Sequence, residues 1–191
     1  ALPISSNVAR NIAFELLVAA KFASAGLKID FGTKADLRIN LEDFTVYVEC
    51  KRPQSSHQIN SNIKGALSQL EERYKSHDGA KNPRGIIAIS LTKILNPDQE
   101  ILVARNTESL HSTTEKMLDR FHNDYKSKWF LPRDTKSIGA MIYFSVPTSV
   151  EDENIIAHSH QIDFTNCCDP KCDDMRLIRN IKSKTMMILL I

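Results

Sequence analysis

The chain has 191 residues, of which 42% are hydrophobic and 25% charged, and its formal net charge is +2. This length and apolar content predict one domain, residues 1–191, that needs no disulfide to fold. Near-neutral charge excludes a polybasic protein, so any contact with nucleic acid must come from local patches. Four cysteines are too few for a disulfide scaffold, and no signal peptide or long apolar run is visible. A cytoplasmic protein without a membrane partner is therefore expected.

The first predicted element is a helix from Ser5 or Ser6 to about Ala25, ended by Gly26. Glu15 is one of two charged residues in its apolar part, and the other, Lys21, lies too far round the helix to pair with it. A buried carboxylate is costly unless it is paired or bound to a metal. Glu15 is therefore a candidate functional residue, with an ion pair to a cation or contact with solvent as the alternatives. Most of the helix circumference is apolar, which predicts deep burial: Ile12, Phe14, Leu16, Leu17, Val18 and Phe22.

Two short stretches that alternate between apolar and polar residues, 35–41 and 44–51, predict a pair of strands. Their connection, Glu42-Asp43, is two residues long and suits an antiparallel hairpin. In the second strand Glu49 and Lys51 share one face, whereas Cys50 points to the other.

Folding this hairpin brings Asp36, at the start of the first strand, level with Glu49 and Lys51 at the end of the second. Two carboxylates then converge with an ammonium group at one end of a sheet. Oxygen ligands of this kind suit Mg²⁺ or Mn²⁺. A surface ion pair between Glu49 and Lys51 is the simpler alternative, because such pairs are common and weak.

The rest of the chain predicts an α/β fold with a mixed central sheet of four to five strands. A helix over about 58–76 carries a polar stripe in which Gln69 is a candidate site residue and Gly65 allows close approach of a ligand; the stripe comprises Gln58, Asn62, Gly65 and Gln69. A strand buried on both faces is predicted at 85–91, and a long helix at 107–128. Two further strands are predicted at 138–146 and 154–164. A short helix and then a strand are predicted over 175–191.

Asp36 followed by Glu49-Cys50-Lys51 resembles the signature of the PD-(D/E)XK nuclease superfamily, which has the restriction-endonuclease-like fold. The resemblance covers roughly Asn7 to Leu91 and continues loosely to the strand near Ile138. Ala35 stands where the pattern has proline. The resemblance implies a three-layer α/β/α domain with a core at about 7–146 and a C-terminal extension over 147–191.

The resemblance also implies a Mg²⁺- or Mn²⁺-dependent hydrolase that cuts nucleic-acid phosphodiester bonds, with DNA favoured over RNA. It assigns Asp36, Glu49, Glu15 and the backbone carbonyl of Cys50 to the metal, and Lys51 to the attacking water. Gln69 would orient the phosphate or the water. Candidate contacts to the nucleic-acid backbone are Lys34, Arg38, Arg52, Lys64 and Arg84.

Two alternatives from other classes remain. The same fold serves as a non-catalytic nucleic-acid-binding or assembly domain, and the carboxylates could simply pair with local cations. A homodimer or a partner subunit is compatible with the sequence. Restriction, repair, recombination and phage defence all use this fold, so the fold does not define the biological role.

A second set of metal ligands is offered by the C-terminal part of the chain. His158 and His160 precede three cysteines, Cys167, Cys168 and Cys172, which are soft ligands suited to zinc. The spacing is permissive rather than diagnostic, and we favour reduced cysteines.

Overall fold

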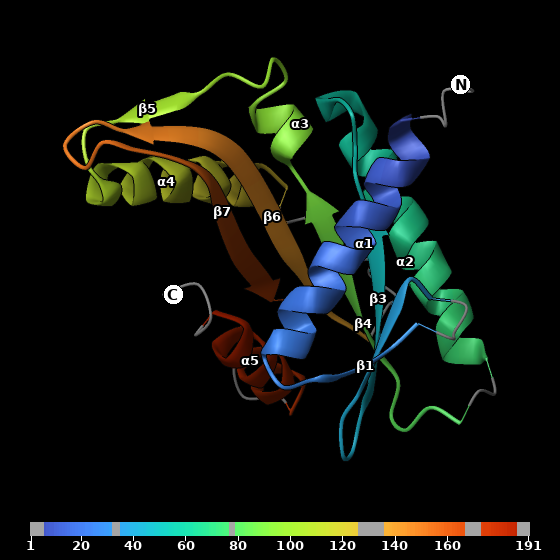
Figure 1. Ribbon diagram of the computed structural model, residues 1–191. Helices are drawn as coiled ribbons and strands as arrows, with labels where there is room; N and C mark the ends of the chain where they lie inside the picture. Colours follow the sequence, from blue (N-terminus) through green and yellow to red (C-terminus); the bar gives the residue numbers. More distant parts are fainter. Residues whose placement is uncertain (1–5, 32–34, 77–78, 126–135, 167–172, 187–191) are drawn as a thin grey trace.

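The structure is a computed structural model that describes residues 6–31, 35–76, 79–125, 136–166 and 173–186. Its elements in chain order (Figure 1) are α1 (Ser6–Ser24), β1 (Lys28–Asp30), β2 (Leu37–Asn40), β3 (Thr45–Lys51), the 3₁₀ turn η1 (Ser56–Gln58), α2 (Ile59–Lys75), β4 (Arg84–Ser90), α3 (Thr92–Leu95), β5 (Leu102–Ala104), α4 (Thr107–Tyr125), β6 (Ser137–Val150), β7 (Ile155–Asn166) and α5 (Asp173–Met186). This order confirms the α/β class. None of the helices in these ranges combines the length and apolar character that a membrane crossing requires.

The described strands form one mixed sheet of seven strands in the order β1-β2-β3-β4-β6-β5, and β7 pairs with β6. The pairs β3–β4, β4–β6 and β5–β6 are parallel, whereas β1–β2, β2–β3 and β6–β7 are antiparallel. The sheet exceeds the predicted four to five strands. The strand β1 coincides with a short strand candidate at Leu27–Phe31 in the sequence, whereas β5 was not predicted, because its three residues are too few to show a period.

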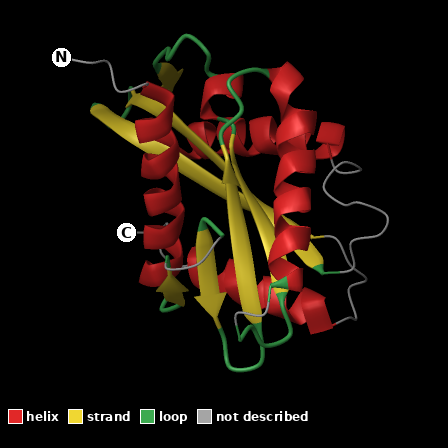
Figure 2. Ribbon diagram, turned by 90° about the vertical axis from the view of Figure 1, so that its right-hand side faces the viewer, coloured by secondary structure: helices red, strands yellow, loops and turns green. Residues whose placement is uncertain are grey.

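Helices cover both faces of this sheet, as Figure 2 shows. On one face, α1 and α5 pack on β2, β3, β4, β6 and β7 through a core that includes Phe14, Phe22, Ile39, Met141 and Ile178. On the other face, α2 and α4 pack through a core that includes Tyr47, Ile63, Leu67, Phe121 and Phe144. The central strands are therefore buried on both sides.

The prediction that α1 is deeply buried is wrong. Three of its apolar residues, Val8, Ile12 and Leu16, are 54%, 49% and 55% exposed. They are spaced four residues apart and so lie on one stripe of the helix, whereas the stripe that contains Phe14 and Phe22 packs on the sheet. Because apolar residues occur on most sides of this helix, the sequence did not show which stripe packs on the sheet.

The strand β6 is longer than the predicted 138–146 and continues past Pro147 to Val150. A proline has no N–H to donate, which usually ends a central strand. Here residues up to Tyr143 pair with β4, and pairing with β5 resumes at Thr148. Pro147 lies in the gap between them, where this edge of β6 has no strand partner among the described residues.

Replacing two glycines by alanine should change the stability of the protein in opposite directions. A Cβ on Gly139 would lie 2.3 Å from the backbone oxygen of Thr165, so Gly139→Ala should separate β6 from β7 and cost about 3 kcal/mol. Gly65 lies in the middle of α2, and no described atom lies within 4 Å of a Cβ built there. Gly65→Ala should therefore stabilise the helix by about 1 kcal/mol. Urea unfolding of both variants checks the two signs; a destabilised Gly65→Ala would contradict the open environment.

Candidate active site

The predicted hairpin is confirmed and forms the frame of the candidate site. Its register pairs Leu37 with Val48, which places Asp36, one residue earlier, opposite Glu49. The Oδ2 atom of Asp36 accepts a hydrogen bond from the backbone N–H of Cys50 at 2.7 Å. This bond holds the carboxylate of Asp36 at the end of β3, as the sequence predicted.

Glu49 is a buried carboxylate held by two cations. Its side chain has 0% exposure, and its oxygens lie 3.3 Å from Nε of Arg73 and 3.7 Å from Nζ of Lys51. Burial, followed by the charge of Asp36, raises the pKa of Glu49 to about 7, although Lys51 and Arg73 act in the opposite direction. Its Oε2 atom is buried and has no hydrogen-bond partner among the described residues. The site therefore contains a carboxylate oxygen with unused acceptor capacity.

Sequence reasoning missed Arg73. It lies in the last turn of α2, four residues after Gln69, so it continues the predicted polar stripe by one helical turn. The same stripe contains Asn62, which is partly buried. Extending the stripe one turn further would have found Arg73, although its partner Glu49 lies 24 positions earlier in the chain.

A cavity of about 220 Å³ opens beside the end of β3, and the residues that line it come from α1, α2 and the hairpin: Asn11, Phe14, Glu15, Asp36, Cys50, Lys51, Arg52 and Asn62. It brings together Glu15, Asp36 and Lys51. Burial, followed by the charge of Asp36, raises the pKa of Glu15, whereas the charge of Lys51 lowers it. Glu49 and Gln69 are not among the lining residues, and Asn62 takes the position on α2 that Gln69 was predicted to hold.

Of the predicted backbone contacts, Arg52 lies at the cavity and donates a hydrogen bond to Asn11 at 3.3 Å. Arg38 donates to Asn40, and Arg84 forms an ion pair with Asp174 of α5. Lys64 is exposed on α2, and Lys34 lies outside the described residues. Arg52 is thus the one of these cations that the described residues place at the cavity.

The acidic residues are compatible with a hard divalent cation held by two carboxylates. No group of three or more His, Cys, Asp or Glu residues in the described ranges is arranged to hold a metal ion. Mg²⁺ does not require such a group, since it is usually bound by one or two carboxylates, water and substrate phosphate. Asp36 and Glu49, with the unused Oε2 atom, would supply this pair. Burial, followed by the charges of Asp36 and Glu15, raises the pKa of the Cys50 thiol well above its usual value.

The raised pKa of Glu49 predicts a pH-dependent stability in metal-free protein. Between pH 4.5 and about 7 the folded chain holds a proton at Glu49 that the unfolded chain has released. Stability should therefore fall as pH rises through this window, by on the order of 2–3 kcal/mol from this group. Urea unfolding in EDTA across the window, compared with Glu49→Gln, isolates the contribution. An equal pH dependence in the two proteins would contradict it.

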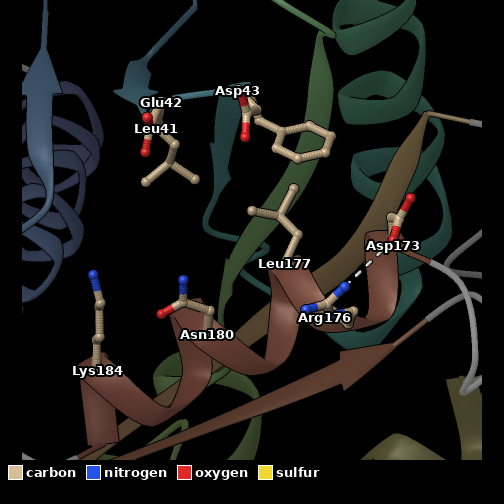
Figure 3. A pocket seen from close by; sticks show the side chains of 9 residues that line it. Leu41, Glu42, Asp43, Asp173, Arg176, Leu177, Asn180 and Lys184 are labelled. Carbon is tan, nitrogen blue, oxygen red and sulfur yellow. Dashed lines mark ion pairs between the residues drawn. The ribbon is translucent and has the colours of Figure 1, made fainter.

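A second concavity, of about 770 Å³, lies between the β2–β3 turn and α5. Figure 3 shows Glu42 and Asp43 on one side and Arg176, Asn180 and Lys184 on the other. Arg176 is itself 3.9 Å from Asp173. The concavity borders the residues that precede β3, at the opposite end of that strand from Lys51, so it is separate from the candidate active site.

The predicted zinc ligands fall into two groups. His158 and His160 lie in β7, whereas Cys167, Cys168 and Cys172 lie outside the described residues.

No protein-family model, curated protein or solved structure matches this chain.

Proposed function

We propose that this protein is a metal-dependent nuclease of the PD-(D/E)XK type, with a restriction-endonuclease-like fold, that hydrolyses phosphodiester bonds in nucleic acid, DNA in preference to RNA. The observation that carries the proposal is the register of the hairpin, which sets Asp36 opposite Glu49. Lys51 follows Glu49 in β3 and lies 3.7 Å from it, and Glu15 lines the same cavity as Asp36 and Lys51.

Each residue has a distinct task in this proposal. Asp36 and Glu49 would hold Mg²⁺ or Mn²⁺, with the backbone carbonyl of Cys50 as a further oxygen. Glu15, which lines the same cavity as Asp36, would add an acidic group beside this pair. The metal, when bound, would neutralise charge on the scissile phosphate and acidify a water molecule. Lys51 orients or deprotonates the attacking water and stabilises negative charge on the phosphate in the transition state.

Two polar residues extend the site beyond the signature. Asn62 lines the cavity from α2 and takes the task of orienting the phosphate or the water that the sequence assigned to Gln69. Arg73 neutralises part of the charge on Glu49. We assign Arg73 as a positioning residue because it contacts Glu49 and not the cavity.

The ion pair between Glu49 and Arg73 also favours a second candidate function. A carboxylate that is already paired with Arg73 and Lys51 needs no metal, as expected of a non-catalytic domain that only binds nucleic acid or assembles with a partner. Burial raises the pKa of Glu49 although both cations lower it, so the two ion pairs do not fully offset the cost of burying this charge.

A cleavage assay on supercoiled plasmid, linear duplex, single-stranded DNA and structured RNA tests the proposal. Each substrate is incubated with Mg²⁺, with Mn²⁺ and with EDTA. The proposal expects cleavage that EDTA abolishes. Binding without cleavage on every substrate and with either metal would contradict it and support the non-catalytic alternative.

A further inference from the structure

Two exposed histidines in β7 share one face of the sheet, away from the candidate active site. His158 and His160 are two positions apart, so their side chains leave the strand on the same side, and their ring centroids lie 5.3 Å apart. In the same strand Ile162 packs in the core beneath α1, which fixes this side as the α1 face. Figure 1 shows β6 and β7 continuing past α1, and His158 and His160 lie exposed on this part of β7.

Both imidazole rings are anchored through the same ring atom. Nδ1 of His160 lies 2.6 Å from the hydroxyl of Tyr143, and Nδ1 of His158 lies 2.8 Å from the hydroxyl of Ser145. Tyr143 and Ser145 are both 5% exposed, so the rings are held from beneath. This arrangement leaves the two Nε2 atoms as the groups available to a ligand.

The hydrogen bond to Tyr143 determines what His160 offers. Burial raises the pKa of Tyr143, so its hydroxyl stays protonated and can donate to Nδ1 of His160 in the tautomer that carries the imidazole proton on Nε2. A neutral imidazole that accepts at Nδ1 carries its own proton on Nε2. In that tautomer His160 presents an N–H donor to solvent, which suits an anion.

The charges around this pair favour an anion as well. Burial, then the charge of His158 and then that of Lys21 lower the pKa of His160. Lys21 is thus a cation whose charge acts on this ring. A cation at this position favours a phosphate as the ligand.

The surrounding surface extends this patch. Val103, Ser149 and Ile156 lie side by side across β5, β6 and β7, and Val103 and Ile156 are 59% and 83% exposed. An apolar strip beside two anchored donors can accept the sugars and bases of a strand whose phosphates contact the imidazoles.

The patch is also connected to the candidate active site. The ring of Phe14, which lines the cavity, lies 5.7 Å from the ring of Tyr143. Along α1, Lys21 follows Glu15 by six residues, a rise of about 9 Å. A single nucleic-acid strand that crosses α1 can therefore contact both sites.

We propose that His158, His160 and Lys21 form a phosphate clamp that binds the backbone of the nucleic-acid substrate on the open face of β6 and β7. The proposal rests on the proposed function for the class of ligand, but it concerns residues outside the carboxylate site. Tyr143 and Ser145 are positioning residues, since they act through the two rings.

Binding of a fluorescently labelled duplex and of the matching single strand, measured by anisotropy in EDTA, tests the clamp without cleavage. The double variant His158→Ala/His160→Ala should raise Kd about tenfold on at least one of the two probes, as expected for the loss of one or two charge-assisted hydrogen bonds. His158→Gln/His160→Gln, which keeps an N–H donor on each side chain, should bind more tightly than the alanine variant. His111→Ala is the matched control, because His111 is an exposed histidine on α4; its Kd should not change.

The outcomes separate the clamp from the nuclease proposal. Unchanged binding by the folded alanine variant, with clear binding by wild type, would overturn the clamp and leave cleavage at the carboxylates standing. No binding of either probe by wild type would overturn the clamp, whatever the cleavage assay shows. Nitrogen-15 NMR of the imidazoles adds a readout on the residues themselves: the clamp expects the Nε2–H tautomer of His160, and an Nδ1–H tautomer that binds Zn²⁺ would overturn it.

Discussion

Lys51→Ala should lower the rate of cleavage by about 100-fold or more, the range expected for loss of a positioned proton-transfer or charge-stabilising group. Lys51 is the cation at the end of β3, with a side chain that is 17% exposed. Its removal leaves the hairpin hydrogen bond between Asp36 and Cys50 in place. Folding and metal binding should therefore stay nearly unchanged.

The comparison must be made at a pH above the Glu49 pKa of about 7. Lys51 lowers the pKa of both Glu15 and Glu49, so its loss also favours their protonation, and a high pH separates this indirect effect from the direct one. Lys75→Ala, which removes an exposed lysine that is paired with Glu71 on α2, is the control. Wild-type cleavage by Lys51→Ala would refute the catalytic assignment.

Glu49→Gln should abolish cleavage and, above pH 7, stabilise the metal-free protein by on the order of 1–3 kcal/mol. The two effects have one cause. Burial and the charge of Asp36 make the ionised form of Glu49 costly in the folded state, and glutamine has nearly the shape of the protonated acid. A charged residue that makes the ligand-free protein less stable than a neutral residue of the same shape would is typical of residues kept for function.

The non-catalytic alternative makes the opposite prediction for the same variant. If Glu49 serves to pair with Arg73 and Lys51, its replacement leaves two cations that are 15% and 17% exposed without a partner. Glu49→Gln would then be destabilised. Urea unfolding in EDTA at a pH above 7, together with the cleavage rate, gives both readouts; a destabilised and fully active variant would exclude the proposed role.

The hairpin could be predicted from sequence because its constraints are local. Strict alternation and a two-residue connection leave one register in which the apolar residues of both strands share a face. That register, and with it the position of Asp36 opposite Glu49, appears in the structure. Glu49 and Lys51 could be placed side by side because residues two positions apart in a strand lie on the same face.

The residues that the helices place at the candidate site could not be predicted to the same precision. A helical stripe shows which residues share a face but not which turn is level with the end of β3. That depends on how residues 52–58, including η1, lead into α2. The cavity is therefore lined by Asn62 rather than Gln69, and the contact between Arg73 and Glu49 was not foreseen. The exposed stripe of α1 was missed for a related reason, since an apolar helix does not reveal which side meets the sheet.

The most direct test of the central claim is nicking of supercoiled plasmid with Mn²⁺ by wild type, Asp36→Asn and Asp43→Asn. Asp36 lies at the candidate site, whereas Asp43 lies in the β2–β3 turn at the other end of β3, so the two substitutions change charge equally but at opposite ends of one strand. We expect nicking by wild type and by Asp43→Asn, and none by Asp36→Asn. Equal nicking by all three proteins, or nicking by none, would contradict a nuclease site at these carboxylates.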